Sequence, residues 1–401
     1  MKKQTLFLAF IVAIASGTIF SCKKHKLDNM VGQVQKGPFA KGTSVTVTEL
    51  ESGLKPTGKT YSATINNDKG TFSIPDVTLK SPYVNLTADG YYFNEITGKI
   101  SDGRLVLHAI ADVSNASTVN VNILTHLEKA RVEYLIDVEE MTFTKAKQQA
   151  QQEVLAIFNM SNSSVPNSEE LDIAQSGDGN AKLMAISVIV QGSLTTGELS
   201  EFLANIADDI KEDGTLDNAA SQSTLINHAK YLWLKEIRQN TESRFINLGI
   251  SAVLPDFEQH VQHFVKHTNY ALTKIIHYPL VDNSSILNVM HPSHLLFEAF
   301  NRNFSPSARY RFSGTLPAGV KAKYVFKNTS ANLNNQLQIW SNSPDIDVSL
   351  NFDTGIHVVN FKTAGITFNE TIKFTGNGSA TIEYFEHGDS APSMVKNISW
   401  E

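Results

Sequence analysis

The chain has 401 residues, with 34 Lys and Arg against 40 Asp and Glu, a formal net charge of −6 and a single cysteine. The scattered basic residues and the acidic balance argue against a nucleic acid partner. One cysteine excludes an intrachain disulfide, an iron–sulfur cluster and a zinc–thiolate centre. A hydrophobic fraction of 41% is enough for packed cores, and the length predicts roughly two or three domains.

A positive start, an apolar run and the cysteine occupy the first residues. Met1-Lys2-Lys3 precede the apolar stretch 6–20, which is too short and too early for a membrane span, so residues 1–21 are expected to be a signal peptide. Residues Ile19-Phe20-Ser21-Cys22 resemble the lipobox of bacterial lipoproteins. That resemblance implies cleavage before Cys22 and its acylation, which would anchor the protein in the bacterial cell envelope, at the outer membrane. The membrane face is left open, and the alternative is an uncleaved signal anchor with a chance cysteine.

Residues 22–30 are polar and are expected to form a lipidated tether. Over residues 31–115, short β-branched runs alternate with turns rich in Asn, Asp and Gly, which predicts an antiparallel β-sandwich. The spacings Gly32-x-Val34 and Asp68-x-Gly70-x-Phe72 resemble the carboxypeptidase regulatory-like, transthyretin-like sandwich. The resemblance implies a spacer or interaction domain with no active site.

The apolar period changes to that of helices over residues 116–303, which predicts a helical bundle. Thr195 and Glu198 fit a capping box, segment 183–190 is expected to be the central helix, and further helices are expected over 257–276 and 291–300. A β-module followed by residues 121–128, VNILTHLE, resembles uncharacterised bacterial lipoproteins. That resemblance implies a location in the cell rather than an activity.

Alternating strands return over residues 304–401 and predict a second β-sandwich. Gly376-Asn377-Gly378 predicts a hairpin between strands over 371–374 and 380–385, because these residues tolerate positive φ. The expected fold class is a multidomain β + α protein with an N-terminal antiparallel β-sandwich, a central helical bundle and a C-terminal β-sandwich.

Two loops resemble ligand-binding motifs. Residues 53–60, GLKPTGKT, match the phosphate-loop pattern, but a strand-like run follows where a helix is needed. A hairpin turn is the favoured interpretation, and no nucleotide partner is expected. The run Asp209, Asp213 and Asp217 lacks a calcium loop's third and twelfth ligands, so it predicts a helix end and a turn.

A row of histidines is the candidate metal site. Spacings of three and four put His260, His263 and His267 on one helical face, where three imidazoles and a water would make a catalytic zinc site. His277, His291 and His294 lie close in sequence. A solvated or packed helix face is the favoured interpretation, so no cofactor is expected, and a zinc hydrolase is an alternative.

Trp340 and Tyr324 are the candidate ligand-binding residues of the C-terminal module. Aromatic rings beside Asn amides suit sugar stacking, but the same residues also fill sandwich cores. The main prediction is an envelope lipoprotein, held at the membrane by its N-terminal lipid, that acts as a non-enzymatic binding or assembly module for a protein or glycan partner. Glycan capture is the first alternative, and zinc hydrolysis is the second.

Overall fold

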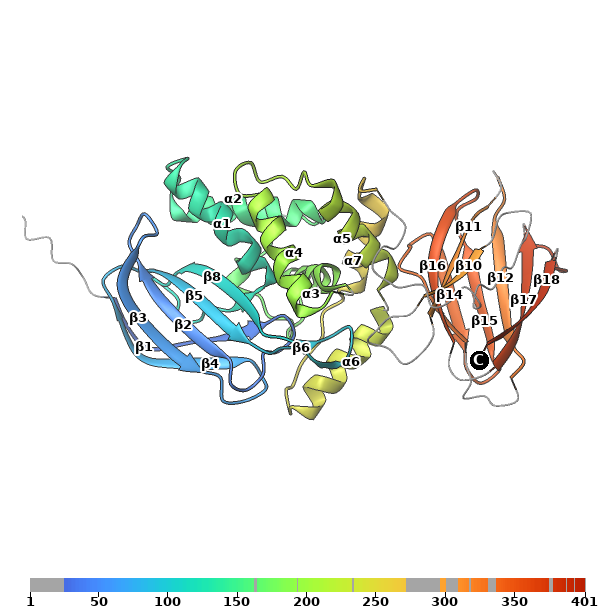
Figure 1. The fold of residues 1–401 in the computed structure, drawn as a ribbon, viewed down its shortest axis with the longest axis horizontal. Helices are drawn as coiled ribbons and strands as arrows, with labels where there is room; N and C mark the ends of the chain where they lie inside the picture. Colours follow the sequence, from blue (N-terminus) through green and yellow to red (C-terminus); the bar gives the residue numbers. More distant parts are fainter. Residues whose placement is uncertain are drawn as a thin grey trace, which may run out of the picture.

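The structure is a computed structural model that describes residues 25–161, 164–192, 194–232, 234–271, 296–300, 309–316, 319–330, 337–374, 378–386, 388–392 and 394–400. In these residues the chain forms N-terminal sheets, then helices, then C-terminal sheets, and Figure 1 shows the helices between the two β regions. The predicted multidomain fold of mixed β and α structure is confirmed.

The N-terminal region contains two main sheets and one short ladder. The first sheet has the order β3 (Pro56–Thr64), β2 (Ser44–Leu50), β5 (Tyr83–Gly90) and β8 (Leu105–Asp112); the second has the order β4 (Thr71–Leu79), β1 (His25–Gln35) and β9 (Val121–Asn122); the ladder joins β6 (Phe93–Asn94) to β7 (Lys99–Ile100). All pairs are antiparallel except β1 with β9. Along β5 the side chains alternate between half-buried and buried, as the period of a strand requires.

The tether predicted over residues 22–30 is wrong from His25 onward. His25 already pairs with Leu79 of β4, and Met30 is fully buried. The hydrogen bonds to β4 stabilise the strand on one side, so its polar side chains can stay exposed without disrupting it. The polarity of the residues therefore does not distinguish a linker from a strand that pairs with one neighbour and keeps its side chains exposed.

The phosphate-loop-like residues 53–60 lie in and after the turn of a hairpin. β2 and β3 pair antiparallel, with Thr48 opposite Thr60, and Leu54 has a φ of 58° in the turn. The interpretation as a hairpin turn is confirmed, because β3 occupies the place where a phosphate loop needs a helix.

Seven α-helices lie in the described residues. They are α1 (Ile123–Asp137), α2 (Phe143–Ile157), α3 (Asp178–Gln191), α4 (Thr196–Asp209), α5 (Ala219–Tyr231), α6 (Leu234–Asn247) and α7 (Glu258–His267), with a 3-10 turn η1 (Ser168–Glu170) before α3. The predicted central helix is α3, which is buried around nearly its whole circumference. The predicted capping box is confirmed at the start of α4, where the Thr195 side chain accepts from the Glu198 amide.

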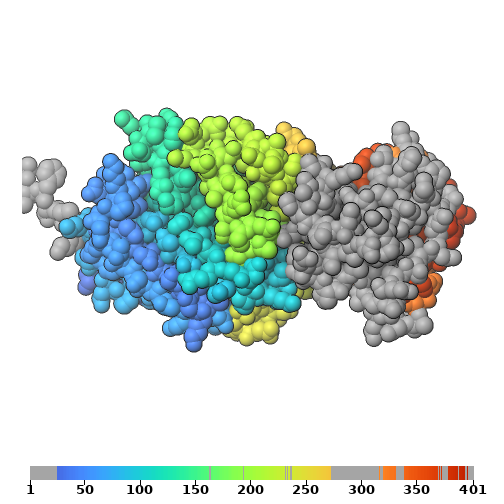
Figure 2. Space-filling model, viewed as in Figure 1, coloured from blue at the N-terminus to red at the C-terminus, as the bar shows by residue number. Residues whose placement is uncertain are grey.

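One hydrophobic core runs from the N-terminal sheets into the helices. Met30 and Val47 on strands belong to the same cluster as Leu127, Met184 and Val261 on helices. Figure 2 shows the surfaces of the two regions meeting without a break. The predicted boundary at residue 115 therefore separates two kinds of secondary structure but not two cores.

Two helices predicted near the end of the helical region differ from the structure. α7 ends at His267 instead of continuing to 276, because Thr268 takes extended backbone angles and the Tyr270 hydroxyl donates to the Ile157 carbonyl at 3.0 Å. Residues 272–276 lie outside the described residues. The helix predicted over 291–300 is wrong where it is described, since Leu296–Phe300 is strand β10 and pairs with β11. Pairing in the sheet here overrides a weak helical preference.

The C-terminal region is a sandwich of two sheets. One has the order β10, β11 (Arg309–Thr315), β16 (Thr367–Phe374) and β13 (Leu337–Trp340); the other has the order β14 (Ile346–Asn351), β15 (Ile356–Phe361), β12 (Ala322–Asn328), β17 (Gly378–Glu386) and β18 (Met394–Trp400). Its core cluster draws on both sheets and is separate from the first core. The module begins before the predicted residue 304, because β10 belongs to it.

The hairpin predicted at Gly376-Asn377-Gly378 is wrong. β16 pairs with β11 and β13, whereas β17 pairs with β12 and β18, so the chain crosses from one sheet to the other between them. Gly376 and Asn377 themselves lie outside the described residues. Flexible turn residues permit a tight reversal, but the burial of each strand's apolar face decides which strands pair.

Candidate functional site

Several predicted site residues lie outside the described residues. They are Cys22, with the whole stretch 1–21 that is predicted to be a signal peptide, and the additional histidines His277, His291 and His294. Among the described residues, no helix combines the length and the apolar character that crossing a bilayer requires.

The three candidate zinc ligands all lie on α7 but do not converge. His260 Nε2 lies 2.9 Å from Asp178 Oδ1 at the start of α3. The rings of His263 and His267 lie in contact, tilted by 33° with centroids 4.1 Å apart, and His267 Nδ1 lies 2.9 Å from the His263 carbonyl oxygen. Within the described ranges, no group of three or more His, Cys, Asp or Glu side chains is placed to hold a metal ion. The row is therefore built as a helix face, with His260 packed against α3.

Tyr324 is buried, contrary to its predicted role as a ligand contact. It lies on β12 with no exposed surface, and its ring centroid is 4.8 Å from that of Tyr384 and 5.9 Å from that of Phe361. Each of these residues belongs to the sandwich core. The alternation of β12 turns this side chain inward, so a ligand outside cannot reach it.

Trp340 instead lines a groove between the helices and the C-terminal sandwich. The groove has a volume of about 470 Å³; α6 and α7 form one wall, and the end of β13 with β14 forms the other. Trp340 is half-buried at the end of β13. We call this the Trp340 groove.

The helical wall of the Trp340 groove presents an ordered ion pair. Arg238 donates to both carboxylate oxygens of Glu258, at 2.6 and 2.7 Å, and to the Pro255 carbonyl at 2.8 Å. These bonds to Glu258 raise the pKa of Arg238. The side-chain amide of Gln262, one turn further along α7, makes no hydrogen bond to any described residue. The wall therefore offers a fixed guanidinium–carboxylate pair and an uncommitted amide.

Two contacts fix the walls of the Trp340 groove relative to each other. The buried Asn342 side chain donates to the carbonyl oxygens of Ala229, at 2.6 Å, and Leu232, at 2.8 Å. Lys230 forms an ion pair at 2.9 Å with Glu370, which has no exposed surface. Both contacts join the end of α5 to the sandwich, so the groove has a defined width.

A second, larger groove lies where the N-terminal sheets meet the helical region. Its volume is about 620 Å³, and residues 31–33 of β1 and 71–73 of β4 form one side of it. The other walls come from side chains within 64–67, 118–120 and 170–175. We call it the amide groove, because Gln33, Asn66, Asn67, Asn120 and Gln175 line it.

The polar side chains of the amide groove hold one another in place. Asp172, which is 8% exposed, accepts from Gln35 Nε2 at 2.6 Å and from Gln33 Nε2 at 3.1 Å. Its Oδ1 also accepts from the Ala174 amide at 2.8 Å. The Asn120 side chain accepts from the backbone N–H of Gln33 at 2.9 Å and donates to the Leu171 carbonyl oxygen at 3.0 Å. The groove is thus preorganised by bonds between strand β1 and the loop before α3.

Sequence reasoning missed the amide groove. The partners Gln33 and Asp172 are 139 positions apart, and Gln33 and Asn120 are 87 apart. No local motif marks such a set, although polar residues at alternate positions in the buried half of β1, Gln33 and Gln35, were a signal that this face meets other polar groups.

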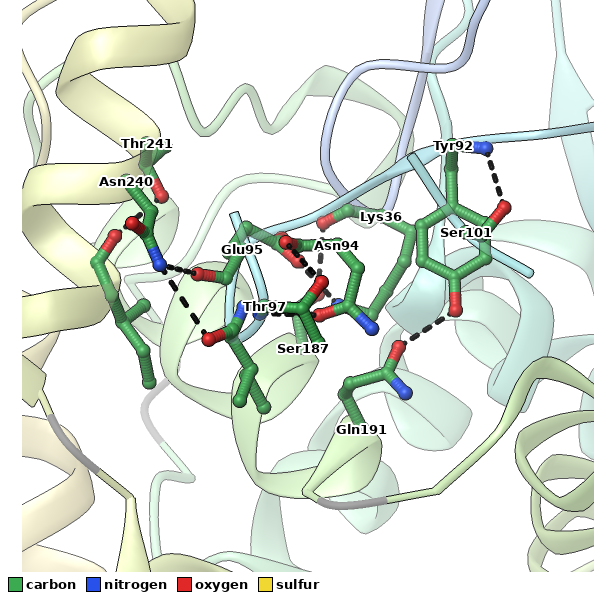
Figure 3. A network of polar contacts seen from close by, with 12 residues as sticks. Lys36, Tyr92, Asn94, Glu95, Thr97, Ser101, Ser187, Gln191, Asn240 and Thr241 are labelled. Carbon is green, nitrogen blue, oxygen red and sulfur yellow. Dashed lines mark hydrogen bonds and ion pairs between the residues drawn. The ribbon is translucent and has the colours of Figure 1, made fainter. Parts of the chain in front are cut away.

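Beyond Gln35, the chain enters a buried polar cluster that joins the sheets to the helices (Figure 3). Lys36 Nζ donates to Glu95 Oε2 at 2.6 Å, and neither side chain has exposed surface. On α3, Ser187 donates to the Lys36 carbonyl at 3.0 Å and Gln191 accepts from the Tyr92 hydroxyl at 2.8 Å. On α6, Asn240 donates to the Glu95 carbonyl at 3.0 Å. The hydrogen bonds of this Lys36–Glu95 cluster connect the N-terminal sheets to α3 and α6 and hold the two regions together next to the amide groove.

Comparisons with known proteins add little. No protein-family model matches the chain, and no curated protein matches it. Among solved structures, the C-terminal domain of the AgI/II polypeptide BspA of Streptococcus agalactiae aligns with 24% of this chain and 40% of its own length, at 12% identity and a TM-score of 0.16. A likeness this slight carries no argument about fold or function.

Proposed function

We propose that the protein is a lipid-anchored bacterial envelope protein that acts as a non-enzymatic binding or assembly module. The lipobox-like residues 19–22 support the anchor, and β1 begins at His25, three positions after Cys22. With so short a connection, the N-terminal sheets would stand at the membrane surface. The C-terminal sandwich lies at the far end of the molecule, beyond the helices (Figure 1), and would be presented away from the membrane.

Replacement of the acylated residue tests the anchor. Cys22→Ser is expected to abolish incorporation of labelled palmitate, because no acyl chain can then form on this residue, and to leave the protein either unprocessed or released from washed membranes. Ser21→Ala is the matched control, since it keeps a small residue before the cysteine and is expected to stay labelled. Membrane retention of a processed Cys22→Ser protein would refute the lipid anchor.

Glycan capture in the Trp340 groove is a second candidate function. It is favoured by one observation: the half-buried indole of Trp340 faces a groove that also carries the Arg238–Glu258 pair and the uncommitted amide of Gln262. An aromatic face packs on the C–H face of a sugar ring, and the flanking polar groups bond its hydroxyls.

The glycan proposal is tested with a glycan array and two variants of one residue. Trp340→Ala is expected to weaken binding about tenfold or more, and Trp340→Phe to weaken it less, with melting temperatures close to that of the wild type. Tyr324→Phe is the control in the sandwich core and is expected to leave binding unchanged. A large loss of stability in Trp340→Ala with no change in binding would show that Trp340 only fills space.

A further inference from the structure

The amide groove has a consistent hydrogen-bonding character. Glu170 and Asp172 can only accept hydrogen bonds when ionised, whereas the hydroxyls of Thr64, Thr71 and Thr118 and the side-chain amides donate and accept. None of the described lining residues is Lys or Arg. A ligand that fits these walls must bring many donors and no negative charge.

Asp172 contributes most to the preference of the groove for hydrogen-bond donors. Both of its oxygens accept from side-chain amides, and none of the described basic side chains forms an ion pair with it. Among the described residues, its partners are the neutral donors Gln33, Gln35 and the Ala174 amide. Because a carboxylate has about four acceptor positions, capacity remains on Oδ2 for a donor from the ligand.

The strand side of the groove is partly apolar. Gly32 lies between Val31 and Gln33, and a Cβ atom there would lie 2.0 Å from the Val119 carbonyl oxygen and 2.7 Å from the ring of Phe72. Any larger residue at position 32 would displace these walls. The half-buried Val31 adds a small apolar surface next to Gln33.

Among donor-rich molecules, a sugar fits better than a peptide. Each hydroxyl of a sugar ring can donate to a carboxylate, whereas peptide N–H groups alternate with carbonyl oxygens that would face Glu170 and Asp172. The volume lies within the range of small-molecule sites, and the few placed polar groups are held by the network described above.

We propose that the amide groove is a binding site for an uncharged saccharide and that it rejects acidic sugars. This site is separate from the Trp340 groove and does not depend on it. The carboxylates of Glu170 and Asp172 repel an anionic ring, so the selection is electrostatic as well as geometric.

The test compares sugars of matched size by isothermal titration of the full chain from Lys23 onward. The probes are galactotriose, cellotriose and the N-acetylglucosamine trisaccharide, with trigalacturonate as the acidic counterpart of the first. At least one neutral probe is expected to bind saturably and at least tenfold more tightly than trigalacturonate. Failure of all three neutral probes, or equal binding of trigalacturonate, overturns the proposal.

Two variants assign any binding to this groove. Thr118→Trp fills the groove from an exposed position and is expected to abolish binding, whereas Asn115→Trp on the same loop does not line the groove and is expected to have no effect. Glu170→Gln, at an exposed site, is expected to reduce the ratio between the affinity for the neutral probes and the affinity for trigalacturonate. Binding that survives Thr118→Trp but is lost in Trp340→Ala would place the sugar in the other groove and overturn this assignment.

Discussion

The buried pair of Lys36 and Glu95 makes a quantitative prediction about what holds the sheets to the helices. The Lys36 ammonium lies 2.6 Å from Glu95 Oε2, both side chains are fully buried, and the second carboxylate oxygen has no hydrogen-bond partner among the described residues. Among the described residues, Lys36 is the cation that forms an ion pair with this carboxylate. Removing one partner of such a pair costs about 3–5 kcal/mol, which is a large part of the roughly 5–15 kcal/mol stability of a typical domain.

Lys36→Met is expected to lower the free energy of unfolding by about 3–5 kcal/mol, and the double variant Lys36→Met, Glu95→Leu to recover most of that loss. The recovery follows because two apolar side chains replace two charges of similar volume. Urea titrations of the wild type, both single variants and the double variant give the coupling energy. Losses that simply add in the double variant would refute the pairing.

The pH dependence of Lys36→Met provides an independent check. Burial raises the pKa of Glu95, and the attraction of Lys36 opposes that rise in the wild type. Without Lys36, the folded state binds a proton on Glu95 at a pH where the unfolded state does not. The deficit of Lys36→Met is therefore expected to be smallest at acidic pH, where Glu95 is protonated with or without Lys36, and to grow at higher pH, where Glu95 ionises in the folded wild type but stays protonated in the variant. A deficit that is constant with pH would mean that the lost packing, rather than the charge, causes it.

Three further predictions concern other parts of the molecule. Burial lowers the pKa of His126 to about 3, so the contribution of this residue to stability is complete above the unfolded pKa of about 6.5 and falls by about 1–2 kcal/mol between pH 7 and 5. In denaturant titrations, His126→Leu should lack this pH dependence. A flat wild-type profile would disprove the prediction. Gly192 has a φ of 45°, and a Cβ there would lie 2.1 Å from the ring of His228, so Gly192→Ala should cost about 1–3 kcal/mol by thermal melting, whereas Gly197→Ala, in open space, should not destabilise the protein. Asn342→Ala removes both side-chain bonds to the end of α5 and should speed proteolytic separation of the sandwich from the helices; unchanged digestion would show that these bonds do not hold the junction.

Local pattern predicted the elements that neighbouring residues define, such as a continuous apolar run or a capping box. α3 and the capping box of α4 were read correctly because the residues that make them are neighbours in sequence. The same local view gave a helix at β10 and a hairpin between β16 and β17, since both depend on which strands meet across the sandwich.

The candidate sites show the same limit more sharply. Trp340 and Tyr324 are both aromatic residues on predicted strands, yet Trp340 lines a groove and Tyr324 is fully buried. The difference arises because Tyr324 points from β12 into the sandwich core, whereas Trp340 points from β13 away from that core. The histidine row has the spacing of a metal site, but His260 is turned toward Asp178 by the packing of α7 on α3. The amide groove depends on contacts across more than a hundred positions, which one sequence does not reveal.

The separation of the two cores has a consequence for how the protein can change over time. The N-terminal sheets and the helices share one cluster of buried side chains, so an exchange of either part would disturb the other. The C-terminal sandwich has its own core, and in the described part of the chain side chains at the end of α5 join it to the rest. Recombination at this junction would exchange the C-terminal sandwich as a unit and leave the shared core of the N-terminal sheets and the helices intact.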